Sequence, residues 1–429
     1  MCVAIAGFFV RSLFFKEDKS EFLIGEATHG HYQIELACSS CHLEPFGGKE
    51  ILQNACENCH AQELEIAQDS HPKKKFTDPR NANRLAGLDA RYCVSCHTEH
   101  QEEQTHAMGL TLPEDYCYHC HSDVAEERES HQDLAFNSCA SAGCHNYHDN
   151  RALYENFLVK NANQDWLSAI AAMPPLNGAS ASAHAHVKPV NTSSQIQSQV
   201  AKHSDIQQSF LHTRHGEANV ECAHCHSSET QTWLQSPGVA QCQSCHQHEA
   251  EGFLASKHGM RLATSTLDAM TPAQSKGQFH TDAGDKHQNC SACHSAHEFD
   301  TQTAAVESCL GCHADDHSQA YLSSPHGQQW ADKTLLDNRQ KVTCATCHLP
   351  RLETDQTDEN GQAIVRVQHN QNDTLRPNEK MIRPVCMQCH SLEFSIDALA
   401  DPQLINNNFN GQPSEHIPSI DWALKRVSE

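Results

Sequence analysis

The sequence predicts a mainly α-helical fold with extensive coil and little or no β-sheet, whose interior is not filled by its own side chains. Hydrophobic residues make up 38% of the 429 residues and aromatic residues 6%, which is little material for an ordinary core. A cysteine motif occurs eleven times, ten times as five residues and once in a longer form, and 429/11 gives only about 39 residues per motif. Spacings near 20 residues between neighbouring motifs leave room for one short helix and a turn.

The motif is two cysteines separated by two residues, with a histidine directly after the second cysteine. Ten copies are regular, and a stretched copy from Cys139 to His145 has four residues between its cysteines. Together they use 22 of the 23 cysteines and leave only Cys2 over. In chain order the motif residues are Cys38, Cys41, His42; Cys56, Cys59, His60; Cys93, Cys96, His97; Cys117, Cys120, His121; Cys139, Cys144, His145; Cys222, Cys225, His226; Cys242, Cys245, His246; Cys290, Cys293, His294; Cys309, Cys312, His313; Cys344, Cys347, His348; and Cys386, Cys389, His390.

The histidine next to the second cysteine separates three explanations of this pattern. A disulfide framework does not place a histidine after every second cysteine. A structural zinc site needs four ligands, usually as two separated pairs, and a histidine that abuts a cysteine reaches the same ion poorly. Covalent c-type haem fits, because two thiols add to the porphyrin vinyl groups and the histidine ligates the iron. The sequence therefore predicts eleven covalently attached haems and a haem-cored, multihaem cytochrome c fold.

A second set of histidines is available as the other axial ligand of each iron. Of the 34 histidines, 34 − 11 = 23 lie outside the motifs, whereas the chain has 7 methionines. Two imidazoles per iron and low reduction potentials are therefore expected. The spacing does not decide which histidine serves which haem. The candidates are His29, His31, His71, His100, His106, His131, His148, His215, His258, His287, His297, His317, His326 and His369.

A cysteine-free segment between His145 and Cys222 divides the motifs into two groups. Its centre is rich in small, polar and proline residues, which is typical of a flexible linker. We interpret the histidines of its SAHAH stretch as incidental. The predicted organisation is a truncated export or membrane-anchor segment at 1–26, a pentahaem module at 27–150, a linker at 151–202 and a hexahaem module at 203–429.

The N-terminal stretch MCVAIAGFFVRSLFF is apolar but too short to span a bilayer alone. It lacks a basic leading region and a small-residue cleavage site, so it is not a complete signal peptide. A buried hydrophobic segment is one interpretation. A truncated export or anchor segment is favoured, because c-type haem is attached outside the cytoplasm. We expect a periplasmic or otherwise extracytoplasmic protein, held at the membrane if this segment is retained.

The formal net charge is −24, and ionised haem propionates would make it more negative. Nucleic acid and anionic lipid are therefore poor partners, and redox partner proteins with basic docking surfaces are expected. The one basic run, from Lys73 to Lys75, is interpreted as a solvated segment, with docking or propionate neutralisation as the alternative.

Two family resemblances follow from these residues. Residues 27–150, with HGHYQIELACSSCH, tandem motifs and the stretched copy, resemble the small low-potential multihaem cytochromes of the class III type. Residues 203–400, with SKHG, SPHGQQW, VTCATCHLPR and VCMQCHSLEF, resemble the hydroxylamine oxidoreductase and octahaem cytochrome c group. That group implies either electron carriers or enzymes. Residues 203–400 depart from it in carrying six motifs instead of eight, and no motif of the chain ends in the lysine of the pentahaem nitrite reductases.

Two functions are compatible with the sequence. The first is relay of electrons through closely packed, mostly bis-histidine haems between redox partners. The second is an oxidoreductase in which one haem lacks a second protein ligand and binds a small nitrogen or sulfur compound such as hydroxylamine, nitrite or tetrathionate. His224, Asp315 or Lys341 are candidate acid–base groups for such a site, and no catalytic residue can be assigned.

Covalent attachment predicts a simple result in mass spectrometry. After proteolysis of the purified protein, every fragment that contains one motif should carry the added mass of one haem, because thioether bonds survive digestion. Motif-bearing fragments of unmodified mass would contradict the haem interpretation.

Overall fold

The structure is a computed structural model, and it describes residues 7–9, 11–12, 19–44, 47–101, 109–113, 116–132, 134, 145–149, 152–164, 172–177, 187, 190–264, 266–358, 360–375 and 377–428. The chain divides into two compact units. The first unit comprises Met1–Lys160, Thr264–Asp268 and Pro418–Glu429. The second unit comprises Asn161–Ala263 and Ala269–Ile417. The predicted module boundaries stay a prediction.

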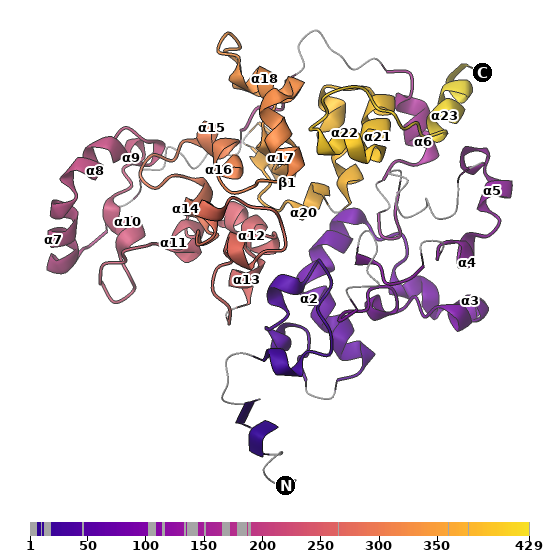
Figure 1. The fold of residues 1–429 in the computed structure, drawn as a ribbon, viewed down its shortest axis with the longest axis horizontal. Coiled ribbons are helices and arrows are strands. Elements are labelled where there is room, and N and C mark those ends of the chain that lie inside the picture. The colour runs from indigo at the N-terminus through magenta and orange to yellow at the C-terminus, as the bar shows by residue number, and fades with distance from the viewer. Residues whose placement is uncertain are drawn as a thin grey trace. The chain divides into compact units, whose positions relative to one another are not determined.

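The first unit is built from short helices, with one long helix among them (Figure 1). The long helix, α2, spans 19 residues and carries the second motif. Its α-helices are α2 (Lys49–Ala67), α3 (Ala82–Gly87), α4 (Tyr118–His121), α5 (Val124–Glu127), α6 (Glu155–Asn161, whose last residue belongs to the second unit) and α23 (Ser419–Ser428). Its 3-10 helices are η1 (Ser20–Phe22), η2 (Tyr32–Ile34), η3 (Cys38–Ser40), η4 (Lys73–Thr77), η5 (Pro79–Asn81), η6 (Cys93–Ser95) and η9 (Glu129–His131).

The second unit continues this pattern of short helices joined by loops. Its α-helices are α7 (Ser194–Lys202), α8 (Ser204–Phe210), α9 (Arg214–Glu217), α10 (Cys222–His226), α11 (Val239–Gln243), α12 (Gln247–Ala255), α13 (Met260–Ala263), α14 (Cys290–Cys293), α15 (Thr301–Ala304), α16 (Glu307–Leu310), α17 (Asp316–Ala320), α18 (Pro325–Ala331), α19 (Cys344–His348), α20 (Asn372–Leu375), α21 (Leu392–Ala400) and α22 (Pro402–Asn406). Its 3-10 helices are η11 (Pro272–Gln274), η12 (Thr281–Ala283), η13 (Tyr321–Ser323), η14 (Asn338–Gln340), η15 (Asn378–Met381) and η16 (Cys386–Gln388).

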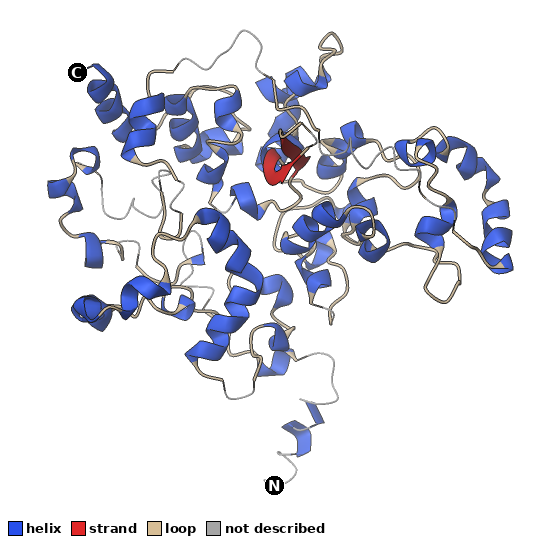
Figure 2. Ribbon diagram, turned by 180° about the vertical axis from the view of Figure 1, so that it is seen from behind, coloured by secondary structure: helices blue, strands red, loops and turns tan. Residues whose placement is uncertain are grey.

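Among the described residues, the sheet is a single antiparallel hairpin of β1 (Arg351–Thr357) and β2 (Ala363–Val367), drawn red in Figure 2. In its turn, Gly361 has a φ of +75°, a conformation that glycine adopts without steric cost. The hairpin begins just after the tenth motif, and the Gln368 amide donates to the Pro350 carbonyl at its base. The hairpin thereby returns the chain to a position beside that motif. His369 lies two residues after the end of β2.

An apolar cluster of the second unit lies around α21, which packs against α22 and η16. Ser391, directly after the last motif histidine, caps α21 by accepting a hydrogen bond from the Phe394 amide. Leu392 is fully buried and Ile396 is 2% exposed. The start of α21 is therefore fixed next to the last motif, and its side chains Leu392 and Ile396 are buried in the cluster.

The mainly α-helical fold with very little sheet confirms the sequence prediction. Half of the N-terminal segment 1–26 lies outside the described residues, and so does the centre of the segment 151–202. The described ends of the latter include α6 and α7, and the Asn177 side chain hydrogen-bonds the backbone of Ala363 and Val365. None of the described helices combines the length and apolar character needed to cross a bilayer.

The cluster around α21 predicts a measurable loss of stability. Leu392→Ala should lower the free energy of unfolding of the second unit by about 2–5 kcal/mol, because it leaves a cavity in packed surroundings. Guanidinium denaturation followed by circular dichroism measures this. Leu336→Ala is the matched control, since Leu336 is 90% exposed and its truncation should change stability by less than about 0.5 kcal/mol. Equal effects of the two substitutions would contradict the packing described here.

Candidate haem-binding sites

Each described regular motif lies in or adjoins a helical turn, which at the second motif is part of the long helix α2. The amide of the motif histidine donates to the carbonyl of the first cysteine, for example from His42 to Cys38 at 2.8 Å and from His390 to Cys386 at 2.8 Å. This turn places the two cysteines three residues apart, so that both lie on one side of the turn with the histidine adjacent. Cys139 and Cys144 of the stretched motif lie outside the described residues, whereas His145 is described.

In the first unit, four motif histidines each face one histidine from outside the motifs. The ring centroids are 5.9 Å apart for His60 with His31, 6.2 Å for His121 with His71, 6.4 Å for His97 with His148 and 6.1 Å for His145 with His131.

In the second unit, all six motif histidines are paired in the same way. The ring centroids are 5.8 Å apart for His246 with His215, 5.9 Å for His226 with His297, 6.2 Å for His313 with His258, 6.4 Å for His294 with His369, 6.0 Å for His348 with His317 and 6.1 Å for His390 with His326.

This spacing tests whether the residues fit an iron. A metal–imidazole bond is about 2 Å long, and a ring nitrogen lies about 1 Å from its ring centroid, so two imidazoles on opposite sides of one ion place their centroids about 6 Å apart. The ten observed distances, 5.8–6.4 Å, match this value. Aromatic rings stacked in direct van der Waals contact approach more closely, as His226 and Trp233 do at 4.5 Å. The residues therefore fit a six-coordinate iron between each pair.

Burial keeps many of these imidazoles in the neutral form that a metal requires. Loss of solvent lowers the pKa of His258, His326 and His348 to about 4. It also lowers the pKa of paired histidines in both units, namely His71, His97, His131, His145, His215, His294, His297, His313, His369 and His390.

Hydrogen bonds at Nδ1 orient many of the rings and leave Nε2 for a metal, except at His317, where the Asn408 side-chain amide lies 3.2 Å from Nε2. Backbone carbonyls accept from His97 (Gly109, 3.0 Å), His226 (Leu234, 2.7 Å), His317 (Ile405, 2.5 Å) and His369 (Val367, 3.0 Å). Such partners fix the tautomer and orientation of a metal-binding imidazole. The ligand candidates are thus held by surroundings that the chain itself supplies.

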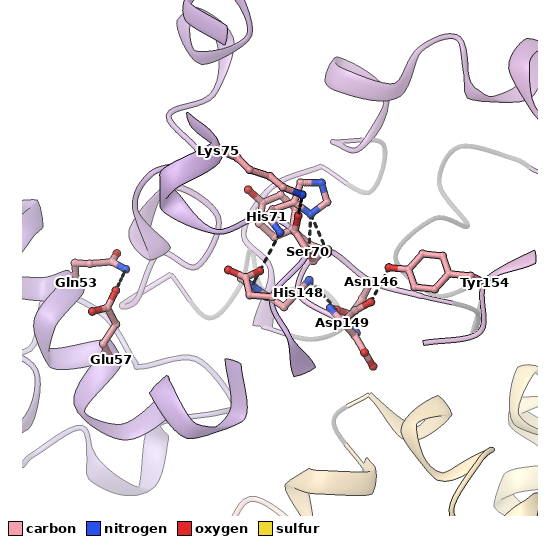
Figure 3. A network of polar contacts seen from close by, with 11 residues as sticks. Gln53, Glu57, Ser70, His71, Lys75, Asn146, His148, Asp149 and Tyr154 are labelled. Atoms are coloured by element: carbon pink, nitrogen blue, oxygen red, sulfur yellow. Dashed lines mark hydrogen bonds and ion pairs between the residues drawn. The ribbon is translucent and has the colours of Figure 1, made fainter. Parts of the chain in front are cut away.

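Two of the outer histidines are tied together by one network of polar contacts (Figure 3). Nδ1 of His71 lies 2.6 Å from the Tyr147 carbonyl, and Nδ1 of His148 lies 3.1 Å from Asp69. The Asn146 side chain accepts from the His148 amide at 2.9 Å and so shapes the turn that carries it. Residues 69–71 and 146–149 therefore position ligand candidates for two different motifs.

The pair at the second motif differs from the others because carboxylates contact both rings. Nδ1 of His31 lies 2.6 Å from Glu99, and Nδ1 of His60 lies 3.0 Å from Glu63. Glu99 also accepts hydrogen bonds from the amide and hydroxyl of Thr28. Burial by itself would raise the pKa of Glu99, but the hydrogen bonds from His31 and Thr28 outweigh it and lower that pKa. Glu99 is therefore held as an ionised acceptor.

His42 of the first motif is the exception among the described motif histidines, since no second imidazole of a described residue faces it at this spacing. Of the remaining predicted ligand candidates, His29 packs against Tyr32, and Nδ1 of His100 lies 3.0 Å from the Gly25 carbonyl oxygen. His287 is exposed. His106 lies outside the described residues.

A histidine that closely follows a motif faces a different motif. His148, three residues after His145, faces His97, and His317, four residues after His313, faces His348. A residue so close in sequence cannot reach the opposite axial side of the same iron, because a porphyrin separates the two sides. The short offsets in the sequence therefore indicate ligands, but for neighbouring motifs.

Consecutive motifs also lie next to one another through their cysteines. The first cysteines of three pairs of motifs lie close to one another, so that each thiol shifts the pKa of the other: Cys56 with Cys93, Cys242 with Cys290, and Cys309 with Cys344. At five other cysteines the pKa is raised. Burial is the first cause, and neighbouring groups that include a thiol of the next motif are the second. These cases are Cys41 beside Cys59, Cys96 beside Cys117, Cys225 beside Cys242, Cys293 beside Cys309, and Cys347 beside Cys389.

These contacts link the motifs in the order of the chain. They connect the first four motifs of the first unit and all six motifs of the second unit. His145 of the stretched motif lies near His121, the histidine of the fourth motif, so it extends the row of motifs in the first unit.

Three other side chains singled out from the sequence, Lys73, Lys75 and Asp315, have partners within the chain. Lys73 pairs with Glu50 at 3.0 Å and lies over the Tyr92 ring, and Lys75 donates to the Ser70 carbonyl. Asp315 caps α17 by accepting from the Ser318 amide. The basic run is thus partly engaged within the chain.

The sequence model of the cytochrome c3 family matches residues 30–122 and 214–314. The first segment contains motifs one to four, and the second contains motifs six to nine. The match and the cysteine motifs support a multihaem c-type cytochrome, a class of extracytoplasmic electron-transfer protein with covalently attached haem c. The resemblance of the second module to the hydroxylamine oxidoreductase group stays a hypothesis.

The histidine pairs predict which substitutions open a haem iron. His258→Ala and His326→Ala should each convert one low-spin haem to high-spin, because each removes one of two facing imidazoles. Electron paramagnetic resonance of the oxidised protein measures this. His287→Ala is the matched control and should leave the spectrum unchanged. Unchanged low-spin signals in both variants would show that the pairs His258–His313 and His326–His390 do not share an iron.

Proposed function

We propose that this protein is an undecahaem cytochrome that relays electrons, one at a time, through two rows of bis-histidine haems. The observation that carries this proposal is the facing of ten motif histidines with ten other histidines at 5.8–6.4 Å. Haem supplies one-electron transfer, and two imidazoles per iron hold it six-coordinate with little change in geometry between oxidation states. Such sites transfer electrons without offering a substrate a vacant position.

The order of the rows supports a conduit. Motifs one to five follow one another in the first unit, and motifs six to eleven do so in the second, as their cysteine and histidine contacts indicate. We propose that electrons pass along each row between neighbours in this order. The physiological partners are proposed to be periplasmic redox proteins with basic docking surfaces, in keeping with the net charge of −24.

The similarity of the two units points to a histidine that could be the second ligand at the His42 haem. His297 lies three residues after His294 and faces His226, the histidine of the first motif in the second unit. His100 holds the equivalent place, three residues after His97, and shares with His297 a positive φ (62° and 71°) that is uncommon for histidine. We therefore propose His100 as the second ligand of the haem at Cys38 and Cys41.

The alternative function, an oxidoreductase for small nitrogen or sulfur compounds, requires a haem with one open position. Among the described motif histidines, only His42 lacks a facing imidazole at this spacing. If His100 ligates that haem, its iron has no open position for a substrate. The two functions therefore make different predictions for the pair of His42 and His100.

For the unmodified protein, we expect an oxidised electron paramagnetic resonance spectrum with low-spin signals that nitrite, hydroxylamine or tetrathionate leave unchanged. His100→Ala should introduce one high-spin haem per molecule, and His287→Ala should introduce none. A high-spin signal in the unmodified protein that shifts on adding one of these compounds would favour the enzyme and overturn the conduit. If His100→Ala changes nothing, the assignment of His100 is wrong.

A further inference from the structure

The two units contain the same arrangement of four motifs. The pairs His31–His60, His71–His121 and His97–His148 of the first unit correspond in order to His215–His246, His258–His313 and His294–His369 of the second. The contact between Cys56 and Cys93 corresponds to that between Cys242 and Cys290. One family also matches both segments. The chain therefore provides equivalent sites whose surroundings can be compared.

His31 and His215 are the most closely matched pair of outer histidines. Each lies seven residues before the first cysteine of its unit (38 − 31 and 222 − 215). Each faces the histidine of the next motif, at 5.9 Å for His31 and 5.8 Å for His215. His31 and His215 therefore occupy equivalent positions in the two units, and their contacts can be compared directly.

The ring of His31 is in contact with a carboxylate through Nδ1. Glu99 lies 2.6 Å from Nδ1, and Thr28 fixes that carboxylate by donating its amide (2.9 Å) and its hydroxyl (3.0 Å). The facing His60 has a carboxylate of its own, Glu63, at 3.0 Å from Nδ1. Both imidazoles of this pair are therefore in contact with negative charge.

The ring of His215 has the opposite surroundings. Its Nδ1 is buried and has no hydrogen-bond partner among the described residues. Phe299 packs against the ring with centroids 4.5 Å apart, and Phe210 stacks nearly parallel to it at 6.5 Å. On the facing His246, Nδ1 is 4.0 Å from Glu249, which is too long for a hydrogen bond. The His215 ring is therefore set in a largely apolar environment, and neither ring of this pair has a carboxylate of a described residue within hydrogen-bond distance of Nδ1.

A carboxylate that accepts the Nδ1 proton makes an imidazole a stronger donor to its metal and stabilises the more oxidised ion. We propose that Glu99, acting through His31, gives the haem at Cys56 and Cys59 a lower reduction potential than its counterpart at Cys242 and Cys245. Glu99 is in this account a positioning and tuning residue that does not contact the iron. The inference rests on the proposed bis-histidine ligation.

Two ligand variants of the full-length haem protein test the ordering. His31→Ala and His215→Ala should each remove one low-spin haem, which identifies its transition in a spectroscopic redox titration. The transition lost in His31→Ala should lie at lower potential than the one lost in His215→Ala. The reverse order, or equal potentials, would overturn the inference.

A second comparison isolates the role of the carboxylate. Glu99→Gln keeps the shape of the side chain but removes its charge, so the transition assigned by His31→Ala should move to higher potential with haem content unchanged. Glu57→Gln is the matched control, because Glu57 belongs to the same motif on α2 and contacts Gln53 at 2.7 Å instead of an imidazole. It should produce a clearly smaller shift.

The outcomes distinguish this inference from the proposed function. No shift in Glu99→Gln, or equal shifts in both glutamate variants, overturns the tuning by Glu99 while the low-spin spectra still support bis-histidine haems. Absence of haem from the second motif, or a high-spin haem there in the unmodified protein, overturns the proposed ligation itself.

Discussion

The facing of two imidazoles across about 6 Å is the constraint on which the rest of this structure depends. It joins residues that lie far apart along the chain, from 145 − 131 = 14 positions for His131 with His145 to 369 − 294 = 75 positions for His294 with His369. Few other long-range forces are available to a chain with 38% hydrophobic residues and short helices. Shared iron would close these loops as a cross-link does, which explains how so little apolar material holds an ordered fold.

Much of the fold and of the inner ligand set was predictable from the sequence. The motif demands a helical turn, so short helices at Cys222, Cys290 and Cys344 follow directly from the residues. The scarcity of apolar residues predicts loops between them. The hairpin from Arg351 to Val367 was not anticipated as a specific element, and its role in returning the chain to His369 depends on the tertiary arrangement.

The outer ligands were predictable as a set but not as pairs. His297 and His317 stand so close to a motif that sequence alone associates them with it, yet they face His226 and His348. The reason is steric, since the two axial ligands of one iron must approach from opposite sides. The contact of Glu99 with His31 spans 68 positions and carries no local sequence signal. Sequence spacing does not tell which histidines form a pair. The similarity of the two units adds this information, and it relates His100 to His297.

Location of the irons tests the central claim most directly. Anomalous X-ray scattering at the iron edge, from crystals of the haem-loaded protein, gives the number and positions of the metal ions without assumptions about the chain. We expect eleven irons, ten of them midway between the paired imidazoles and one beside His42. Irons displaced from these midpoints, or fewer irons than motifs, would contradict it.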